Sequence, residues 1–279
     1  MNSSVPTVPT IVIEPATQFF RLGLRNLWEY RELLYFLAWR DLKARYAQTT
    51  VGLAWAILQP LAMMAVFTFV FGKLANLPSD GIPYPVFAYA ALVPWGYLAK
   101  SLDRGGFSVV AESNLITKVY FPRLIVPFSA TLGGLIDLGI AFILLFVMMI
   151  WFGIPIGWRI VTLPLFVAMT VAIALAVSLW LSALYVQFRD VGAVVPLLTQ
   201  LWMFGSPVVY PVSLVPEKWM WLYTLNPMVG VLEGFRWALL GSHAPDPWVL
   251  GQSIALVAVL LVGGIAYFNR MERTFADVI

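Results

Sequence analysis

The chain has 279 residues, of which 61% are apolar and only 11% are charged, with a formal net charge of +3. Soluble domains contain about 45–50% apolar and about 25% charged residues, so this composition excludes an ordinary soluble domain and predicts a polytopic membrane protein. The chain has no cysteine, which excludes disulfides, thiolate metal sites and cysteine nucleophiles.

The N-terminal tail has the composition of a flexible segment. Residues 1–18 are rich in Ser, Thr and Pro. They have neither the basic start nor the apolar stretch of about 7–15 residues that a signal peptide needs. We expect a flexible cytoplasmic tail rather than a signal peptide.

Residues 19–49 mix aromatic and basic side chains and predict an amphipathic helix. On a helix, one stripe would hold Tyr35, Trp39, Leu42 and Tyr46. Charged residues would flank that stripe, Arg40 and Lys43 on one side, Asp41 and Arg45 on the other. Such a helix lies in the cytoplasmic headgroup region, with its cations near lipid phosphates. Two interpretations stay open: a membrane anchor, or an element that also receives the head group of a lipid-linked substrate.

The rest of the chain, residues 50–279, is expected to form one all-α transmembrane domain. A helix rises about 1.5 Å per residue, so about 20 apolar residues cross the membrane core. We predict six spans, at about 51–72, 85–108, 124–152, 162–187, 191–210 and 248–269. Asp137 then lies inside the third span. There it is either a functional carboxylate that faces a cavity or a neutral, hydrogen-bonded structural residue.

Basic residues are distributed unevenly between the two sides that these spans define. With the N-terminus inside, twelve Lys and Arg residues lie in inner segments. The outer loops hold four, namely Lys73, Arg159, Lys218 and Arg236. Basic residues favour cytoplasmic loops, so we expect both termini in the cytoplasm. Three charged residues near the inner end of the second span are interpreted as interfacial or snorkelling: Lys100, Asp103 and Arg104.

The cytoplasmic loop between the second and third spans contains a short helical pattern that ends at Pro122. Its apolar residues are Leu115, Ile116, Val119 and Tyr120. An exposed helix of this kind either docks into a groove of a partner protein or lies on the bilayer surface, and both interpretations stay open.

Residues 206–241 are apolar but cannot form one spanning helix. Three prolines interrupt the start of the segment and Asn226-Pro227 breaks its middle. Broken backbone at membrane depth is tolerated only where protein or a wet cavity covers it. We therefore expect a re-entrant helical hairpin over residues 216–241, beside a translocation path. Glu233 and Arg236, three positions apart, are placed to pair within it.

Aromatic residues are abundant, with 12 Trp, 19 Phe and 11 Tyr. Interfacial belts account for rings near span ends, and a lining that stacks on sugar rings would use the same residues. In the hairpin these rings include Trp219, Trp221 and Trp237.

Catalytic chemistry has little support in the sequence. The chain has one histidine, His243, so HExxH zinc sites and histidine triads cannot form. It also lacks a G-x-x-x-x-G-K-[ST] phosphate loop. We expect no catalytic residue, metal or cofactor on this chain. If ATP drives transport, another polypeptide must hydrolyse it.

Several motifs occur in a specific order along the chain. The first two are Arg40-Asp41-Leu42-Lys43-Ala44-Arg45-Tyr46 and Gly52-Leu53-Ala54-Trp55-Ala56-Ile57-Leu58-Gln59-Pro60. The others are Asn114-Leu115-Ile116-Thr117-Lys118, Phe188-Arg189-Asp190-Val191, Ser206-Pro207-Val208-Val209-Tyr210 and Asn226-Pro227-Met228. In this order the chain resembles permease subunits of ABC-2-type exporters of lipid-linked polysaccharides. That family exports O-antigen, capsule and teichoic-acid-like polymers.

The resemblance implies a homodimer in the bacterial inner membrane, bound to two ATPase subunits that hold ATP and Mg²⁺. Its other partners would be membrane lipids and a lipid-linked polysaccharide, and no nucleic acid. The resemblance assigns an interface helix where substrate enters, with Tyr35, Trp39, Arg40, Lys43, Arg45 and Tyr46. It assigns coupling to the ATPase to Asn114, Leu115, Ile116, Lys118, Tyr120, Arg189 and Asp190. It assigns a periplasmic gate to Trp219, Trp221, Asn226, Pro227, Glu233, Arg236 and Trp237.

Two other functions stay open at this point. One is an ABC-2 exporter of a small hydrophobic compound, which resistance or antibiotic-synthesis genes beside this gene would favour. The other is a membrane glycosyltransferase or polymerase, which would need a functional carboxylate such as Asp137.

Overall fold

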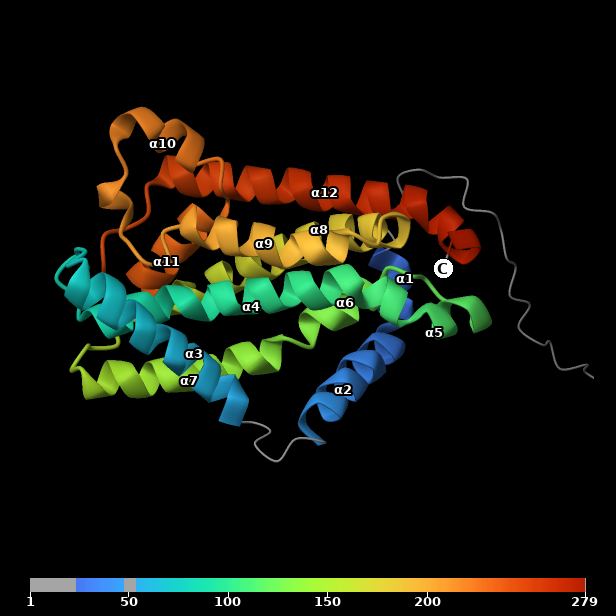
Figure 1. Cartoon of the computed structure of the whole chain (residues 1–279), viewed down its shortest axis with the longest axis horizontal. Coiled ribbons are helices and arrows are strands. Elements are labelled where there is room, and N and C mark those ends of the chain that lie inside the picture. The colour runs from blue at the N-terminus through green and yellow to red at the C-terminus, as the bar shows by residue number, and fades with distance from the viewer. Residues whose placement is uncertain (1–23, 48–53, 279) are drawn as a thin grey trace, which may run out of the picture.

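The computed structural model describes residues 24–47 and 54–278 (Figure 1). Within these ranges every regular element is helical, which confirms the predicted all-α class. The tail predicted over residues 1–18 lies outside the described residues.

The helices follow one another along the chain with short connections. The first seven are α1 (Leu24–Glu29), α2 (Arg31–Ala47), α3 (Ala54–Phe67), α4 (Tyr84–Ala111), α5 (Ser113–Lys118), α6 (Ile125–Leu132) and α7 (Leu135–Trp151). The others are α8 (Leu163–Gln187), α9 (Val191–Phe204), α10 (Glu217–Tyr223), α11 (Met228–Leu240) and α12 (Pro247–Val278). Three irregular helical pieces join them, η1 (Thr68–Leu74), η2 (Trp158–Thr162) and η3 (Val212–Leu214).

Four segments of the described chain are long and apolar enough to cross a membrane. They are Ile57–Leu74, Ile125–Trp151, Trp158–Gln187 and Pro247–Glu272. α4 is long enough but less apolar, because Tyr, Trp, Pro and Lys100 interrupt it. Most of α4 faces protein, so it needs less apolar surface than a helix that faces lipid. α9 is apolar but has only 14 residues.

Two predicted spans differ in shape from their predictions. The span predicted over 124–152 is broken into α6 and α7 at Gly133 and Gly134, where a Cβ on Gly134 would lie 3.1 Å from the ring of Tyr97. Glycine favours such breaks because it is a poor helix former. The span predicted over 191–210 ends at Phe204, since Pro207 disfavours helix in the residue before it.

The remaining helices match their predictions in place but not in every detail. The first predicted span, over 51–72, consists of α3 followed by the π-helical η1, and its first residues lie outside the described part. α12 continues beyond the predicted end at residue 269. α10 and α11 occupy the region predicted as a helical hairpin, with the break at Asn226-Pro227.

α4 and α8 form the centre of the bundle and run side by side in the same direction (Figure 1). They approach closely at Gly105, where a Cβ would lie 2.4 Å from Ser178 Oγ. Ser178 Oγ also donates to the carbonyl of Ser101, at 3.0 Å. The central core therefore depends on a position that only glycine fits.

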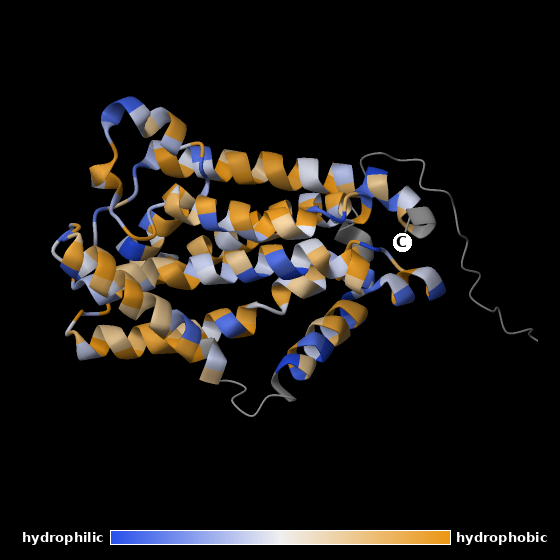
Figure 2. Ribbon diagram, viewed as in Figure 1, coloured by the Kyte–Doolittle hydropathy of each residue, from blue (hydrophilic) through white to orange (hydrophobic). Residues whose placement is uncertain are grey.

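Polar residues gather at the two ends of the bundle (Figure 2). α10 and α11 lie at one end, and α1, α2, α5 and the C-terminal end of α12 lie toward the other (Figure 1). The middle of α12 is apolar and partly exposed (Figure 2). This is the surface pattern of a protein that crosses a lipid bilayer between two aqueous sides.

Candidate functional site

α2 packs against one end of the bundle and exposes part of its aromatic stripe. Leu37 is buried in a core that includes residues of α6 and α8. Tyr35 and Trp39 are exposed and stack on each other, with ring centroids 6.4 Å apart. Leu42, from the same predicted stripe, is buried. Tyr46 lies in α2, but its side chain is outside the described part of the chain.

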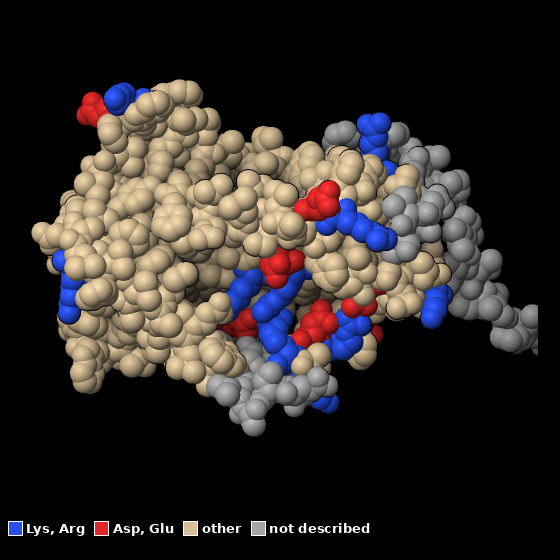
Figure 3. All heavy atoms as spheres, viewed as in Figure 1, with Lys and Arg blue, Asp and Glu red and all other residues tan. Residues whose placement is uncertain are grey.

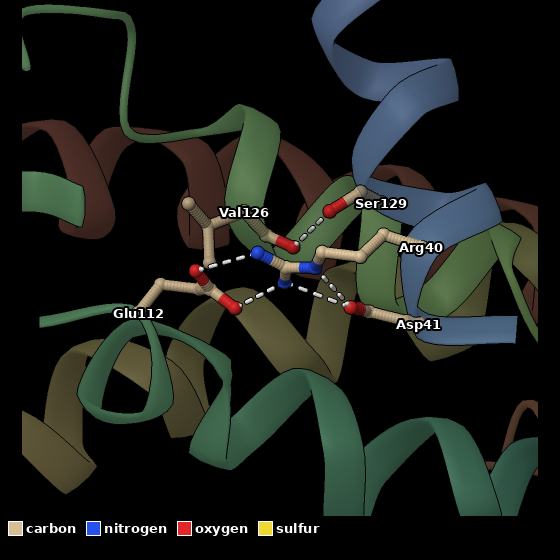
Figure 4. A network of polar contacts seen from close by, with 5 residues as sticks. All are labelled: Arg40, Asp41, Glu112, Val126 and Ser129. Atoms are coloured by element: carbon tan, nitrogen blue, oxygen red, sulfur yellow. Dashed lines mark hydrogen bonds and ion pairs between the residues drawn. The ribbon is translucent and has the colours of Figure 1, made fainter. Parts of the chain in front are cut away.

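A first ionic contact joins α2 to the residue that precedes α5 (Figure 4). Arg40 Nη1 donates to Glu112 Oε2 at 3.2 Å, and Arg40 Nη2 donates to Glu112 Oε1. Arg40 Nε and Nη2 donate to Asp41 Oδ1 at 3.1 and 2.8 Å. The hydrogen bond with Glu112 is the largest influence that raises the pKa of Arg40 above its ordinary value. Beside them, Ser129 Oγ donates to the carbonyl of Val126 within α6.

A second ionic contact joins α2 to α7 and α4. Arg45 Nη1 donates to Asp137 Oδ2 at 2.6 Å, and Arg104 Nη1 donates to the same oxygen at 3.3 Å. The side chains of Asp137, Arg45 and Arg104 are 11%, 24% and 30% exposed. Lys100 interacts electrostatically with all three. Asp137 on α7 is thus the common ion-pair partner of α2 and α4. We call these four residues the Asp137 cluster.

The Asp137 cluster lies beside a small cavity between α3, α4 and α7. The cavity has a volume of about 40 Å³. Lys100 and Asp137 line one part of it, and Leu92, Leu138 and Ala141 line the apolar part. On the face shown in Figure 3, basic and acidic side chains gather in a hollow over the region between α2, α3 and α4. The bundle therefore has a charged depression next to an apolar pocket.

The predicted partner-binding helix forms, but only part of it is exposed. Asn114 and Lys118 on α5 are exposed, and so is Tyr120 just after it. Ile116, by contrast, is buried in the core of this chain, and Leu115 is half-buried. The prediction that Ile116 offers an exposed apolar contact is therefore wrong, because that side chain holds α5 on the bundle.

The turn between α8 and α9 lies at the same end of the bundle as α5. Phe107, near the end of α4, packs edge-on against Tyr185, near the end of α8, with ring centroids 5.3 Å apart. Arg189 and Asp190 lie between the end of α8 and the start of α9 and are exposed. The structure thus brings the two predicted coupling segments to one end of the molecule.

At the opposite end, Asn226 fixes the break between α10 and α11. Its Oδ1 accepts hydrogen bonds from Trp202 Nε1 at 2.8 Å and from the backbone N–H of Met228 at 3.0 Å. Its Nδ2 donates to Ser206 Oγ at 2.8 Å and to the carbonyl of Gly205 at 3.1 Å. One amide side chain therefore joins the end of α9 to the start of α11.

Arg236 on α11 is buried, with 3% exposure, and its head group binds backbone oxygen atoms. It donates to the carbonyls of Val208 at 2.8 Å, Phe87 at 3.4 Å and Tyr210 at 3.5 Å. Two of these bonds, to Val208 and Tyr210, satisfy carbonyls in the non-helical chain after α9, and the third reaches α4. Among the described residues no ion pair joins Arg236 to Glu233, contrary to the expected pairing, because the guanidinium turns to these carbonyls.

The remaining predicted gate residues differ in their exposure. Trp219 and Trp221 on α10 are exposed, whereas Trp237 on α11 is half-buried beside Arg159, whose guanidinium lies 5.8 Å from the ring centroid. Pro227 immediately precedes α11.

Sequence reasoning missed the partners of the charged residues on α2. Glu112 lies 72 residues from Arg40, and Asp137 lies 92 residues from Arg45. No local spacing pattern connects such distant positions. The available signal was the presence of isolated charges next to apolar spans, which shows that partners are needed but not which ones.

The helical bundle, its apolar exposed surfaces and its polar ends define a membrane protein with several membrane-crossing helices. The chain matches the ABC-2 type transporter family over residues 32–240, about three quarters of its length. The chain belongs to this family of transporter membrane domains.

Named relatives match along almost their whole length. The O-antigen export system permease protein RfbA of Myxococcus xanthus is 30% identical over 92% of this chain and 98% of its own. A protein of the same name from Klebsiella pneumoniae is 29% identical over 91% and 97%. The polysialic acid transport protein KpsM of Escherichia coli is 24% identical over 84% and 91%.

Proposed function

We propose that this chain is the permease subunit of an ATP-driven exporter that moves a lipid-linked polysaccharide, of O-antigen type, from the cytoplasm to the periplasm. The observation that carries the proposal is the near full-length match to permeases named for O-antigen export, within the ABC-2 family. In such exporters the permease works with a separate ATPase subunit. Two copies of this chain and two ATPase subunits would form the transporter.

The proposed topology has six spans with both termini in the cytoplasm. α4 and α9 add to the four segments that are long and apolar enough to cross on their own. This topology puts α2, α5 and the α8–α9 turn on the cytoplasmic side, and α10 and α11 at the periplasmic end as a re-entrant gate. Cysteine scanning tests it on this cysteine-free chain. Cysteines at Ser213 and Ser242 should react with a membrane-impermeant reagent from outside, and one at Ser113 should react only from inside.

The proposed roles follow from these positions. α2, held at the membrane boundary, would receive the lipid-linked substrate. α5 and the turn with Arg189 and Asp190 would contact the ATPase through exposed polar side chains. The Asn226 and Arg236 contacts would hold the gate closed at rest, since both tie α11 to the chain that follows α9.

Deletion of the gene in its own host tests the function directly. Surface polysaccharide should disappear while lipid-linked polymer accumulates in the cytoplasm, and a plasmid copy should restore export. Unchanged surface polysaccharide in the deletion strain would contradict the proposal. The purified chain alone should hydrolyse no ATP, and its complex with the ATPase should do so.

A further inference from the structure

α5 has little packing of its own to hold it on the bundle. It has six residues, of which Ile116 is buried and Leu115 is half-buried, while the others are more exposed. A helix this short is marginal by itself, because most helical stability in proteins comes from packing. The position of α5 therefore depends on contacts of the segments directly before and after it.

The segment before α5 is held by the Arg40–Glu112 contact. Glu112 lies between the end of α4 and the start of α5, so this contact ties the start of α5 to α2. The segment after α5 begins with extended backbone at Val119 and leads to α6. It includes Pro122, which has no backbone N–H to donate. This side of α5 needs an attachment of its own.

Arg123 supplies that attachment, and it reaches the C-terminal part of α12. Its backbone N–H donates to Glu272 Oε1 at 3.2 Å, and its Nη1 donates to the backbone carbonyl of Glu272. Arg123 also lies directly before the N-terminal end of α6, where a nearby negative charge is favourable. Each residue thus contributes one backbone group and one side-chain group to the contact.

Apolar side chains pack the same two segments together. Phe121 and Leu124, in the connection between α5 and α6, belong to one buried core with Phe268 and Phe275 of α12. The rings of Phe268 and Phe275 pack edge-on, with centroids 5.3 Å apart. The two hydrogen bonds beside this core are partly buried, and a lower local dielectric strengthens them. The last turns of α12 and the connection after α5 therefore form one packed unit.

We propose that Arg123 and Glu272 are positioning residues for α5. They hold the connection after α5 on α12, and so keep the exposed side chains of Asn114 and Lys118 in one orientation toward a partner protein. That this partner is the ATPase rests on the proposed function, whereas the attachment itself does not. The C-terminal part of α12 thus supports α5 in addition to completing the last membrane span.

Hydrogen–deuterium exchange of the full chain in lipid nanodiscs tests the attachment. Amides of residues 113–118 exchange through local opening of α5, which does not require the whole chain to unfold. Glu272→Ala removes the acceptor of the Arg123 N–H and should speed this exchange by about fivefold, the effect of one hydrogen bond. Glu272→Gln keeps an acceptor oxygen and should stay within about twofold of the original rate.

Gln187→Ala is the matched control, because it removes another contact of the same part of α12. Gln187 Nε2 donates to Met271 Sδ at 3.7 Å, next to Glu272 but toward α8. This variant should leave the exchange of α5 unchanged. An equal rise in Gln187→Ala and Glu272→Ala would show a general loosening of α12 and overturn the inference. An unchanged rate in Glu272→Ala would overturn it as well.

Arg123→Ala keeps the inference testable if Glu272→Ala does not fold. It leaves the side chain of Glu272 and its bond to the Arg123 N–H in place, and removes only the bond to the Glu272 carbonyl. Exchange of α5 should rise by about threefold. Arg123→Lys keeps a donor and should restore the original rate. A rate in Arg123→Ala equal to that of the original chain would contradict the proposed role of the guanidinium.

ATP turnover separates a positioning role from a loss of stability. In the complex with the ATPase, Glu272→Ala should lower maximal turnover by about fivefold, with an unchanged KM for ATP because ATP binds the other subunit. Unchanged turnover despite faster exchange would overturn the positioning role. The exchange measurement needs neither ATPase nor glycan. The expected exchange pattern in a chain that exports no polysaccharide would refute the proposed function alone, and intact export with unchanged exchange in Glu272→Ala would refute this inference alone.

Discussion

The two ionic contacts of α2 differ in their balance of charge. Arg40 is one cation that faces two carboxylates, Glu112 and Asp41. Asp137 is one carboxylate among three cations. The Arg40 contact is also more exposed, with its arginine side chain 40% accessible compared with 11% for Asp137. In the first contact one cation holds two carboxylates, whereas in the second one carboxylate holds arginines from two different helices.

The largest effect is expected from Asp137→Asn in neutral detergent. Removal of the carboxylate breaks the ion pairs with Arg45 and Arg104, and breaking a buried pair in this way costs about 3–5 kcal/mol. Because the arginines are partly exposed, we expect the lower end of that range, visible as reduced thermal stability. A loss of stability no larger than that of Arg40→Ala would remove the contrast between the two contacts.

A smaller effect is expected at Asn226, which lies at the opposite end of the bundle from α2 and serves as a reference. Asn226→Ala leaves the indole N–H of Trp202 and the backbone N–H of Met228 without the oxygen that accepts from them. Loss of a partner by a buried polar group costs about 1–3 kcal/mol. Thermal stability should fall accordingly, by less than for Asp137→Asn. A larger fall than for Asp137→Asn would reverse the assigned order of the two sites.

Charge exchange examines the Arg40 contact. Arg40→Glu and Glu112→Arg should each destabilise the chain, by about 1–2 kcal/mol, because each places like charges together. The double variant should recover most of the loss, since it restores the pair in the opposite direction. Export should follow stability in all three. A stable double variant that does not export would show that Arg40 does more than attach α2.

The smallest effect should come from salt. Ionic strength screens exposed charges more than half-buried ones. Raising salt should therefore weaken the contribution of the Arg40 contact more than that of the Asp137 cluster. Stability measured for Arg40→Ala and for Arg45→Ala relative to the original chain, at low and high salt, checks this. An equal response of both variants would contradict the assigned difference in burial.

The helices could be predicted from the sequence because their signals are local. Apolar length and proline positions placed α8, α12 and the break at Asn226-Pro227 close to where the structure has them. The break between α6 and α7 was missed, because Gly133-Gly134 interrupts an apolar run that is otherwise long enough for one helix. The early end of α9 was missed because apolar residues continue past it.

Site residues were predicted with less detail. The sequence singled out Arg40 and Arg45 on one predicted helix and Asp137 on another, without connecting them. It interpreted Arg236 as a partner of Glu233 from their spacing alone. In the structure, the guanidinium instead donates hydrogen bonds to backbone carbonyls of two distant segments, around Phe87 and Val208. A sequence cannot indicate which carbonyls will accept these bonds, since every residue has one.

The sequence by itself determined that this chain is a helical membrane protein of the ABC-2 kind, because hydropathy, proline breaks and motif order are properties of neighbouring residues. The tertiary structure alone decided which charges meet. Arg45, Lys100, Arg104 and Asp137 come from three helices, and only their packing brings them together. The cost of isolated charges near a membrane requires partners, but several partners would satisfy that requirement equally well. The fold selects among them.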